Sequence, residues 1–345
     1  MVKLPATNIL FKNSEGGLKL MVSYSQIEMF QQCPYKWYKS YIEGMRSFEK
    51  QEATSYGTVI HQMLEYFFKN WRKPNAKDLQ DAYNYFSSQE EIPFESIESG
   101  LMATKDACLL IGWISDLFKK GDDGEYVMKY DDLSPVEKII RKAGTIGIEE
   151  RFELPYKLPV PLETDEGVFT HVHINGSIDL HMGMKKNGKI HHYIVDWKSG
   201  KKTFDKAKLN HNLQHPIYAF YVMRKYGDGL PDIGIYFFTR MREYQLVKVD
   251  EERRDDAVKI LNECFRKMYN FEDRSVSTFL AYIETENENG EKKYSYKYAR
   301  LREPLPENMK PCPSPLCYYC DFGKHKKNLC PYSSTWDPSK KKKKE

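Results

Sequence analysis

The sequence predicts an α/β protein in which helices flank a mixed central sheet. The hydrophobic pattern changes near residue 147 from a helical period to a two-residue alternation. Beyond this point the chain shows three strand patterns, a helix, two further strands and a last helix. Between the second and third strands lies Asn187-Gly188, the dipeptide favoured in type I′ hairpin turns because both positions need a positive φ.

The first 74 residues are predicted to form helices. Ser25 is followed three residues later by Glu28, a capping box that marks a helix start. A second helix is expected over 56–71, where His61 lies beside Gly57 and off the apolar stripe. That stripe consists of Val59, Ile60, Met63, Leu64 and Phe67. Residues 75–146 are mostly helical and polar, and we interpret them as an inserted helical subdomain that covers the core.

The remaining elements are assigned from the change in period. Strands are expected over 147–158, 170–184 and 189–201, followed by a helix over 204–227. Two more strands are expected over 232–240 and 242–250, and a helix over 251–271.

Composition indicates a folded protein of one large or two ordinary domains, with 41% hydrophobic and 30% charged residues in 345. There is neither an apolar run of roughly 18 residues, the length that spans a bilayer, nor a signal-peptide pattern, so we expect an intracellular, cytoplasmic location, or the host cytoplasm for a viral protein. The net charge of +4 depends on the tail Lys340–Glu345, which holds five of the 53 basic residues and one of the 49 acidic ones. Outside this tail the 48 basic and 48 acidic residues balance. A phosphate-binding surface would therefore have to be a local patch of positive charge.

The hairpin turn sets the register of the second and third strands. A two-residue loop pairs Lys186 with Lys189, and the same register continued along the strands sets Asp179 opposite Asp196. Lys198, two residues after Asp196, shares its face of the sheet, whereas Val195 and Trp197 point to the other face. Two acids and a lysine are thus predicted to converge.

Directly opposed carboxylates repel each other unless a cation lies between them. Carboxylate oxygens suit Mg²⁺ or Mn²⁺, which polarise a phosphodiester and lower the pKa of a bound water. A nearby lysine can orient that water or neutralise developing charge. The alternative is an Asp-Lys ion pair on a surface strand, which contributes little.

These residues resemble a known group of enzymes. GSIDLHM followed by IVDWKSGK is similar to the PD-(D/E)xK nuclease core, with Asp179 and Asp196 as the acids and Lys198 as the lysine. The resemblance is closest to the RecB-like exonucleases, which include the CRISPR-associated exonuclease family and the nuclease domains of AddAB-type helicase-nucleases. It implies a restriction-endonuclease-like core over 147–305, preceded by an N-terminal helical part over 1–74 that carries the Cys33 and His61 elements.

The resemblance also implies roles for further residues. His61 would bind the metal together with Asp179, Asp196 and the Trp197 carbonyl. Gln214 and Tyr218, four apart on the following helix, would lie on one face and reach DNA or the attacking water. Pro216 fits between them if the helix begins near Leu213. An acid before the hairpin would complete the site, for which we choose Glu150, with Glu149 and Glu153 as alternatives.

Seven cysteines in an intracellular chain indicate ligands or core residues rather than disulfides. In the iron-sulfur branch of the family, one N-terminal and three C-terminal cysteines bind a [4Fe–4S] cluster. The resemblance assigns these positions to Cys33, Cys317, Cys320 and Cys330, the last three in a module over 306–335. The alternative is a structural Zn²⁺ held by Cys312, Cys317, Cys320 and Cys330, or a zinc site that uses His325.

The expected function is that of a metal-dependent DNA nuclease, an exonuclease acting on single-stranded DNA or DNA ends. The alternatives are a non-catalytic DNA-binding or assembly factor that keeps the fold, and an RNA-directed nuclease. Recombination, CRISPR and phage replication complexes are the protein partners considered. A hairpin turning at Asn289-Gly290 would set Tyr294, Tyr296 and Tyr298 on one face, for base stacking or for packing on the domain. Residues 336–345 are expected to be a disordered basic tail.

Overall fold

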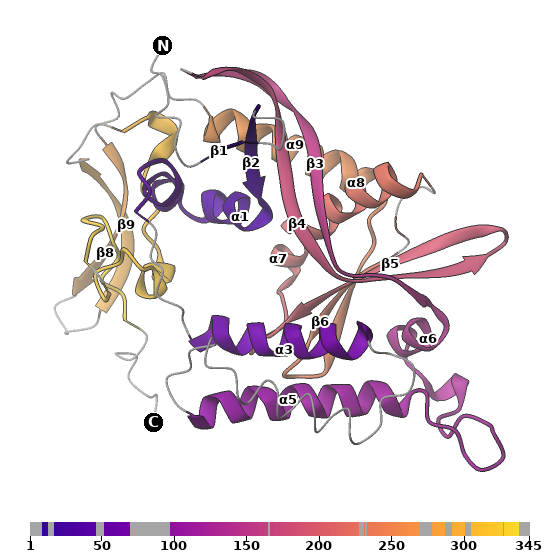
Figure 1. Ribbon diagram of the computed structural model, residues 1–345. Helices are drawn as coiled ribbons and strands as arrows, with labels where there is room; N and C mark the ends of the chain where they lie inside the picture. Colours follow the sequence, from indigo (N-terminus) through magenta and orange to yellow (C-terminus); the bar gives the residue numbers. More distant parts are fainter. Residues whose placement is uncertain are drawn as a thin grey trace. The chain divides into compact units, whose positions relative to one another are not determined.

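The computed structural model describes most of the chain (Figure 1). It describes residues 9–12, 17–45, 52–69, 97–164, 166–227, 231, 233–269, 278–286, 292–300, 305–326 and 328–337. Within these ranges no helix has the length and apolar character needed to cross a bilayer. The predicted turn at Asn289-Gly290, the tail Lys340–Glu345 and residues 75–96 of the predicted insertion lie outside the described residues.

Helices and strands alternate along the chain. The helices are α1 (Tyr24–Gln32), α2 (Pro34–Trp37), α3 (Glu52–Lys69), α5 (Ile97–Asp116), α6 (Pro135–Lys142), α7 (Lys206–His211), α8 (Gln214–Tyr226) and α9 (Glu251–Met268). The strands are β1 (Leu10–Lys12), β2 (Leu18–Ser23), β3 (Gly144–Thr164), β4 (Gly167–Lys186), β5 (Lys189–Lys198), β6 (Ile233–Phe238), β7 (Glu243–Val247), β8 (Thr278–Glu286) and β9 (Lys292–Arg300). Short π and 3₁₀ turns are η1 (Tyr38–Ile42), η2 (Tyr130–Asp132), η3 (Glu307–Met309) and η4 (Pro315–Tyr319).

Seven strands form one mixed sheet, which contains the five predicted strands and also β1 and β2, where only helices were predicted. Its order is β1-β2-β4-β5-β6-β7, and β3 also pairs with β4. The pairs β2–β4 and β5–β6 are parallel, whereas β1–β2, β4–β5 and β6–β7 are antiparallel. β8 and β9 form a separate antiparallel pair, which confirms the predicted hairpin strands. The α/β class with a mixed sheet is therefore confirmed.

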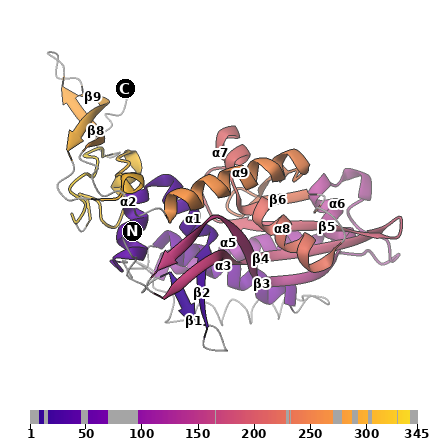
Figure 2. The same ribbon diagram turned by 90° about the horizontal axis from the view of Figure 1, so that it is seen from above.

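The chain divides into two compact units. One draws on Met1–Phe48, Pro155–Asn175 and Val258–Glu345, and the other on Glu49–Leu154 and Gly176–Ala257. Both views show β3 and β4 as long neighbouring strands (Figures 1 and 2). The predicted metal-site and catalytic residues belong to the second unit, and the predicted cluster cysteines belong to the first.

The β4–β5 hairpin has the predicted register. Asn187 and Gly188 adopt φ values of 51° and 77°, as a type I′ turn requires. Lys186 pairs with Lys189, and the ladder runs on to Leu180 opposite Val195. The next position along this register sets Asp179 opposite Asp196.

Helices cover both faces of the sheet in the unit that contains this hairpin. On one face the apolar stripe of α3 packs with α5, α6 and the sheet residues Val195 and Trp197. α3 and α5 lie side by side (Figure 1). On the other face Ala219 of α8 packs with Tyr236 and Phe238 of β6. Because Val195 and Trp197 are buried in the α3 core, Asp196 must face the α8 layer.

Two local predictions needed correction. α1 is capped by Ser23, whose Oγ accepts from the Gln26 backbone, and not by Ser25. The predicted helix over 204–227 is broken into α7 and α8, because Asn212 ends α7 in an extended conformation. α8 begins at Gln214 with Leu213 as its N-cap, so Pro216 lies in the first turn as expected.

Candidate active site

His61 enters the site from α3, which lies close to the chain just after β5 at Gly57. A Cβ at Gly57, one turn before His61, would lie 2.9 Å from Ser199 Oγ. Nε2 of His61 lies 3.1 Å from the Trp197 carbonyl oxygen, and since that oxygen only accepts, Nε2 carries the hydrogen. This bond turns Nδ1 toward two carboxylates, Glu149 at 3.7 Å and Asp179 at 3.6 Å. The Trp197 carbonyl, predicted as a metal ligand, thus also orients His61.

Glu149, one of the two alternatives to Glu150, is the acid that β3 brings to this point. Its φ of 46° lies in the left-handed region, which is uncommon for a residue other than glycine. Ser177 Oγ donates to Glu149 Oε2 at 2.9 Å and holds the side chain in place. Glu150, our first choice, instead contacts His181, Tyr221, Lys225 and Tyr226. The structure therefore sets Glu149, and not Glu150, beside His61 and Asp179.

His61, Glu149 and Asp179 form a group that could hold a metal ion. One ligand atom from each lies within 4.8 Å of the others, and no other group of this kind occurs among the described residues. Burial lowers the pKa of His61, but the charges of Asp179 and Glu149 outweigh it and raise the pKa to about 9. Burial raises the pKa of Glu149, but His61 and Ser177 outweigh it and lower the value overall. A metal would thus compete with a proton for His61 Nδ1.

Asp179 is a buried acid whose charged form is disfavoured by its surroundings. Its Oδ2 accepts from the Trp197 backbone N–H at 2.7 Å, which fixes the carboxylate across the hairpin. Burial raises the pKa of Asp179, and the opposed Asp196 carboxylate raises it further. A bound cation would relieve both effects, because it favours the charged form.

Asp196 lies next to the metal group but outside it. Its carboxylate is 2.6 Å from Lys198 Nζ and also accepts from Gln214 Nε2 at 2.6 Å. Lys198 Nζ donates to Gln214 Oε1 at 2.8 Å, and Tyr218 OH lies 2.8 Å from Gln214 Nε2. Only 2% of the Asp196 side chain is exposed, so the pair is not the surface ion pair considered as an alternative. Four predicted residues thus form one hydrogen-bonded network.

The start of α8 holds this network against the sheet. Asn212 Oδ1 accepts from the Gln214 backbone at 2.8 Å and from Tyr236 OH at 2.7 Å. His215 is fully buried over Gly234, where a Cβ would lie 2.6 Å from its ring. Burial lowers the pKa of His215 to about 3, so the ring stays neutral. Asn212 and Gly234 were not singled out from the sequence, because their roles depend on packing between α8 and β6.

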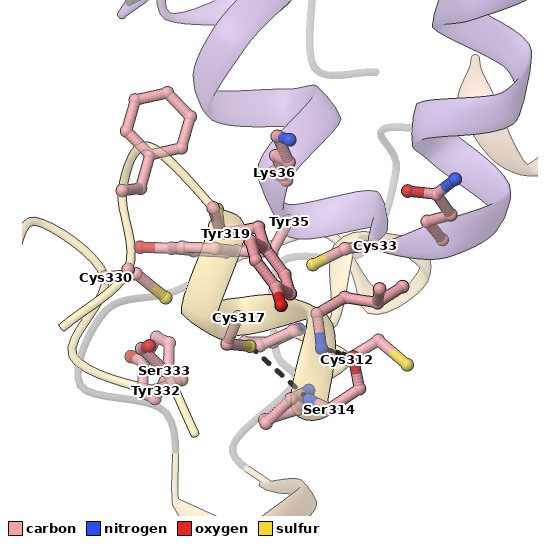
Figure 3. Close-up of a pocket in the computed structure, with 17 residues that line it drawn as sticks. Cys33, Tyr35, Lys36, Cys312, Ser314, Cys317, Tyr319, Cys330, Tyr332 and Ser333 are labelled. Atoms are coloured by element: carbon pink, nitrogen blue, oxygen red, sulfur yellow. Dashed lines mark hydrogen bonds between the residues drawn. The ribbon is translucent and has the colours of Figure 1, made fainter. Parts of the chain in front are cut away.

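The predicted cluster cysteines share one cavity in the other unit. This cavity of about 150 Å³ is lined by Cys33 after α1 and by Cys312, Cys317, Cys320 and Cys330 from the C-terminal segment (Figure 3). In the described residues no three of these sulfurs lie within 4.8 Å of one another. The tight thiolate group expected of a formed metal site is therefore not seen among the described residues, although five cysteines from distant parts of the chain line the same cavity.

One backbone N–H donates to a sulfur of this cavity, and others act to lower the pKa of three further thiols. The Ser314 N–H donates to Cys317 Sγ at 3.4 Å (Figure 3). Burial raises the pKa of Cys33 to about 11 and of Cys330 to about 12, while N–H groups of Lys36 and Cys312 oppose the rise at Cys33 and that of Tyr332 opposes it at Cys330. The Phe322 N–H acts likewise on Cys320, whose pKa burial also raises. The pKa of Cys312 is raised by burial and by Cys317.

Comparison with known proteins establishes the family. A family model described as the PD-(D/E)XK nuclease superfamily matches residues 21–330. The chain therefore belongs to this superfamily, which confirms the predicted fold.

The chain is also similar to proteins named as subunits of an ATP-dependent helicase/deoxyribonuclease. It is 23% identical over 235 residues to the one from Moorella thermoacetica, which covers 62% of this chain and 18% of the relative. For the one from Acetivibrio thermocellus it is 25% identical over 216 residues, 59% of this chain and 18% of the relative. The chain thus spans less than one fifth of the length of these relatives, and the likeness is consistent with the RecB-like branch.

Proposed function

We propose that this chain is a metal-dependent deoxyribonuclease that acts as an exonuclease on single-stranded DNA or DNA ends. The observation that carries this proposal is the contact between two sets of residues in one superfamily core. A group able to bind a divalent cation, His61, Glu149 and Asp179, adjoins a buried acid and lysine, Asp196 and Lys198. The names of the relatives, which are deoxyribonuclease subunits, support DNA as the substrate.

The residues of the site would have different roles in phosphodiester hydrolysis. His61, Glu149 and Asp179 would hold Mg²⁺ or Mn²⁺ next to Asp196, and the ion would supply Lewis acidity and an activated water. Lys198 is held by Asp196 and Gln214, which directs its ammonium group at the reacting phosphate or water. Burial raises the pKa of Tyr218 far above its ordinary value, so its hydroxyl stays protonated beside Gln214. Gln214 and Tyr218 thus fix the position of the lysine.

Substitution of the core residues tests the proposal. Asp196→Ala and Lys198→Ala should each lower nuclease activity by about 10²- to 10³-fold while circular dichroism stays unchanged. Lys119→Ala, at an exposed lysine of the same unit, is the matched control and should keep full activity. Labelled linear and circular single-stranded DNA, duplex DNA and RNA would be compared with Mn²⁺ present. Undiminished activity in both core variants, in preparations free of host nucleases, would refute the assignment.

The same substrates separate the alternatives. A non-catalytic DNA-binding or assembly factor would shift labelled DNA on a gel without degrading it. An RNA-directed nuclease would degrade the RNA strand faster than the DNA strand of equal sequence. Resistance of circular DNA would indicate an exonuclease, whereas its cleavage would indicate an endonuclease.

We further propose a [4Fe–4S] cluster bound by Cys33, Cys317, Cys320 and Cys330. All four cysteines line one cavity, and a backbone N–H donates to Cys317 Sγ, as hydrogen bonds to sulfur do in iron-sulfur sites. Zinc, with Zn–S bonds of about 2.3 Å, would bring four sulfurs to about 3.8 Å from one another. Among the described residues no three of the sulfurs lie within 4.8 Å of one another. A [4Fe–4S] cluster, whose cysteine sulfurs lie farther apart than those around zinc, therefore fits this spacing better.

Metal analysis of anaerobically purified protein tests the cluster. Iron and sulfide with a visible absorption band are expected, and they should be lost in Cys317→Ser but kept in Cys312→Ser. A colourless protein with one zinc that depends on Cys312 would establish the zinc alternative. As the partner we propose a recombination, CRISPR or phage replication complex inside the cell, testable by purifying the tagged chain from its own organism.

A further inference from the structure

Glu150 lies at the centre of a polar cluster on the α8 side of the sheet. Its carboxylate accepts from His181 Nδ1 at 3.0 Å, Tyr221 OH at 2.9 Å and Tyr226 OH at 3.0 Å. Lys225 Nζ adds an ion pair at 2.5 Å. The His181 side chain is fully buried, and only 10% of the Glu150 side chain is exposed. One carboxylate therefore joins β3 to both β4 and α8.

The cluster extends beyond these direct donors. Nε2 of His181 lies 2.9 Å from Nδ1 of His192 on β5, so the hydrogen bonds continue across a third strand. The ring of Tyr221 stacks on Phe152 at 4.9 Å, which ties α8 to β3 a second time. These contacts hold the stretch of β3 just after Glu149 on two sides.

The backbone of β3 is unusual next to this anchor. Glu149 has the left-handed φ of 46°, and its side chain faces His61 while that of Glu150 faces α8. A Cβ at Gly147 would lie 2.5 Å from Glu150 Oε2, so the Glu150 carboxylate folds over the glycine. A left-handed residue other than glycine persists only where surrounding contacts hold it. The hydrogen bond from Ser177 holds the Glu149 side chain, and the contacts of Glu150 hold the backbone on the other side of this residue.

We propose that Glu150 is a positioning residue that sets the divalent-cation affinity of the site through Glu149, without touching the ion. The proposal rests on the proposed function, since it takes His61, Glu149 and Asp179 as the cation site. Loss of the Glu150 carboxylate would free the left-handed backbone at Glu149 and let Glu149 move away from His61. The remaining ligands would then bind the cation more weakly.

A double-mutant cycle tests whether Glu150 acts through Glu149. Binding of Mn²⁺ alone to the full chain would be measured by electron paramagnetic resonance for Glu150→Gln, Glu149→Gln and the double variant. We expect Glu150→Gln to weaken Mn²⁺ binding about 10-fold or more, as second-layer partners of metal ligands do. In the Glu149→Gln background the same change should alter the affinity by less than about twofold. Glu163→Gln, an exposed acid of the same strand, is the matched control and should leave binding unchanged.

A milder variant covers the case in which Glu150→Gln fails to fold. Tyr221→Phe removes one donor to Glu150 but keeps the stacked ring, and it should weaken Mn²⁺ binding about threefold, again only when Glu149 is present. Equal losses in both Glu149 backgrounds, or none in either, would overturn the proposal. If instead the unaltered chain fails to bind Mn²⁺, or binds it equally after Asp179→Asn, the proposed function fails and not the role of Glu150 alone.

Discussion

Asp179→Asn should make the metal-free protein more stable and remove its response to metal. The substitution keeps a side-chain oxygen able to accept the Trp197 N–H, now 2.7 Å from Asp179 Oδ2. It removes the negative charge of Asp179. Burial of this charge and repulsion from the facing Asp196 carboxylate are the two causes that raise the pKa of Asp179. Together with the opposing attraction to His61, these effects raise the pKa of Asp179 to about 7, so at about pH 8 the loss of this charge should stabilise the metal-free protein by a few kcal/mol, on the order of 1.4 kcal/mol for each tenfold change in proton affinity.

Thermal unfolding at about pH 8, with chelator or with Mn²⁺, measures both effects. In chelator the variant should melt a few degrees above the unaltered chain, since about 1 kcal/mol shifts the midpoint of a large domain by about 2 to 4 °C. Mn²⁺ at 100 times its Kd should stabilise the unaltered chain by about 2.7 kcal/mol and the variant hardly at all. The difference between the melting midpoints of the variant and the unaltered chain should therefore shrink or change sign when Mn²⁺ is added.

A control separates this effect from a change in net charge. Asp122→Asn removes an exposed acid in the same unit and should move neither midpoint by more than about 1 °C. If Asp179→Asn is less stable than the unaltered chain in chelator, the attraction of Asp179 to His61 outweighs its burial and its repulsion from Asp196. If it keeps the full response to Mn²⁺, Asp179 is not a ligand.

Three further outcomes follow from the geometry. The stability of the metal-free protein should fall as the pH rises from about 6.5 through about 9, because His61, whose pKa is raised to about 9, loses its proton and its attraction to the carboxylates. Urea titrations over this pH range should show the fall in stability, and His61→Gln should make it smaller. Gly234→Ala should destabilise the protein by about 1 to 3 kcal/mol by crowding His215, whereas Gly112→Ala, in open space within α5, should stabilise it by up to about 1 kcal/mol in the same denaturation assay. Tyr218→Phe should lower kcat about tenfold with little change in KM, because it removes one hydrogen bond to Gln214; an unchanged kcat would exclude that role.

Local sequence patterns were sufficient to place the β4–β5 turn and the start of α8, but not the start of α1. The strands around Asn187-Gly188 and the position of Pro216 in α8 followed from turn geometry and proline sterics, which involve only neighbouring residues. The cap of α1 was misplaced because both Ser23 and Ser25 precede an acid or amide three residues later. Which of the two caps the helix depends on where β2 ends, and that is set by its pairing with β4.

The sequence by itself determined the α/β class, the hairpin register and the convergence of Asp179, Asp196 and Lys198. These follow from a two-residue side-chain period and one turn, so they need no knowledge of packing. Only the tertiary structure decided that Glu149 and not Glu150 approaches His61, because β4 and α3 meet Glu149 whereas His181 and α8 meet Glu150. Packing of α8 on the sheet likewise decided that Gln214 contacts both Asp196 and Lys198. Contacts between distant segments depend on the whole fold, and no local pattern encodes them.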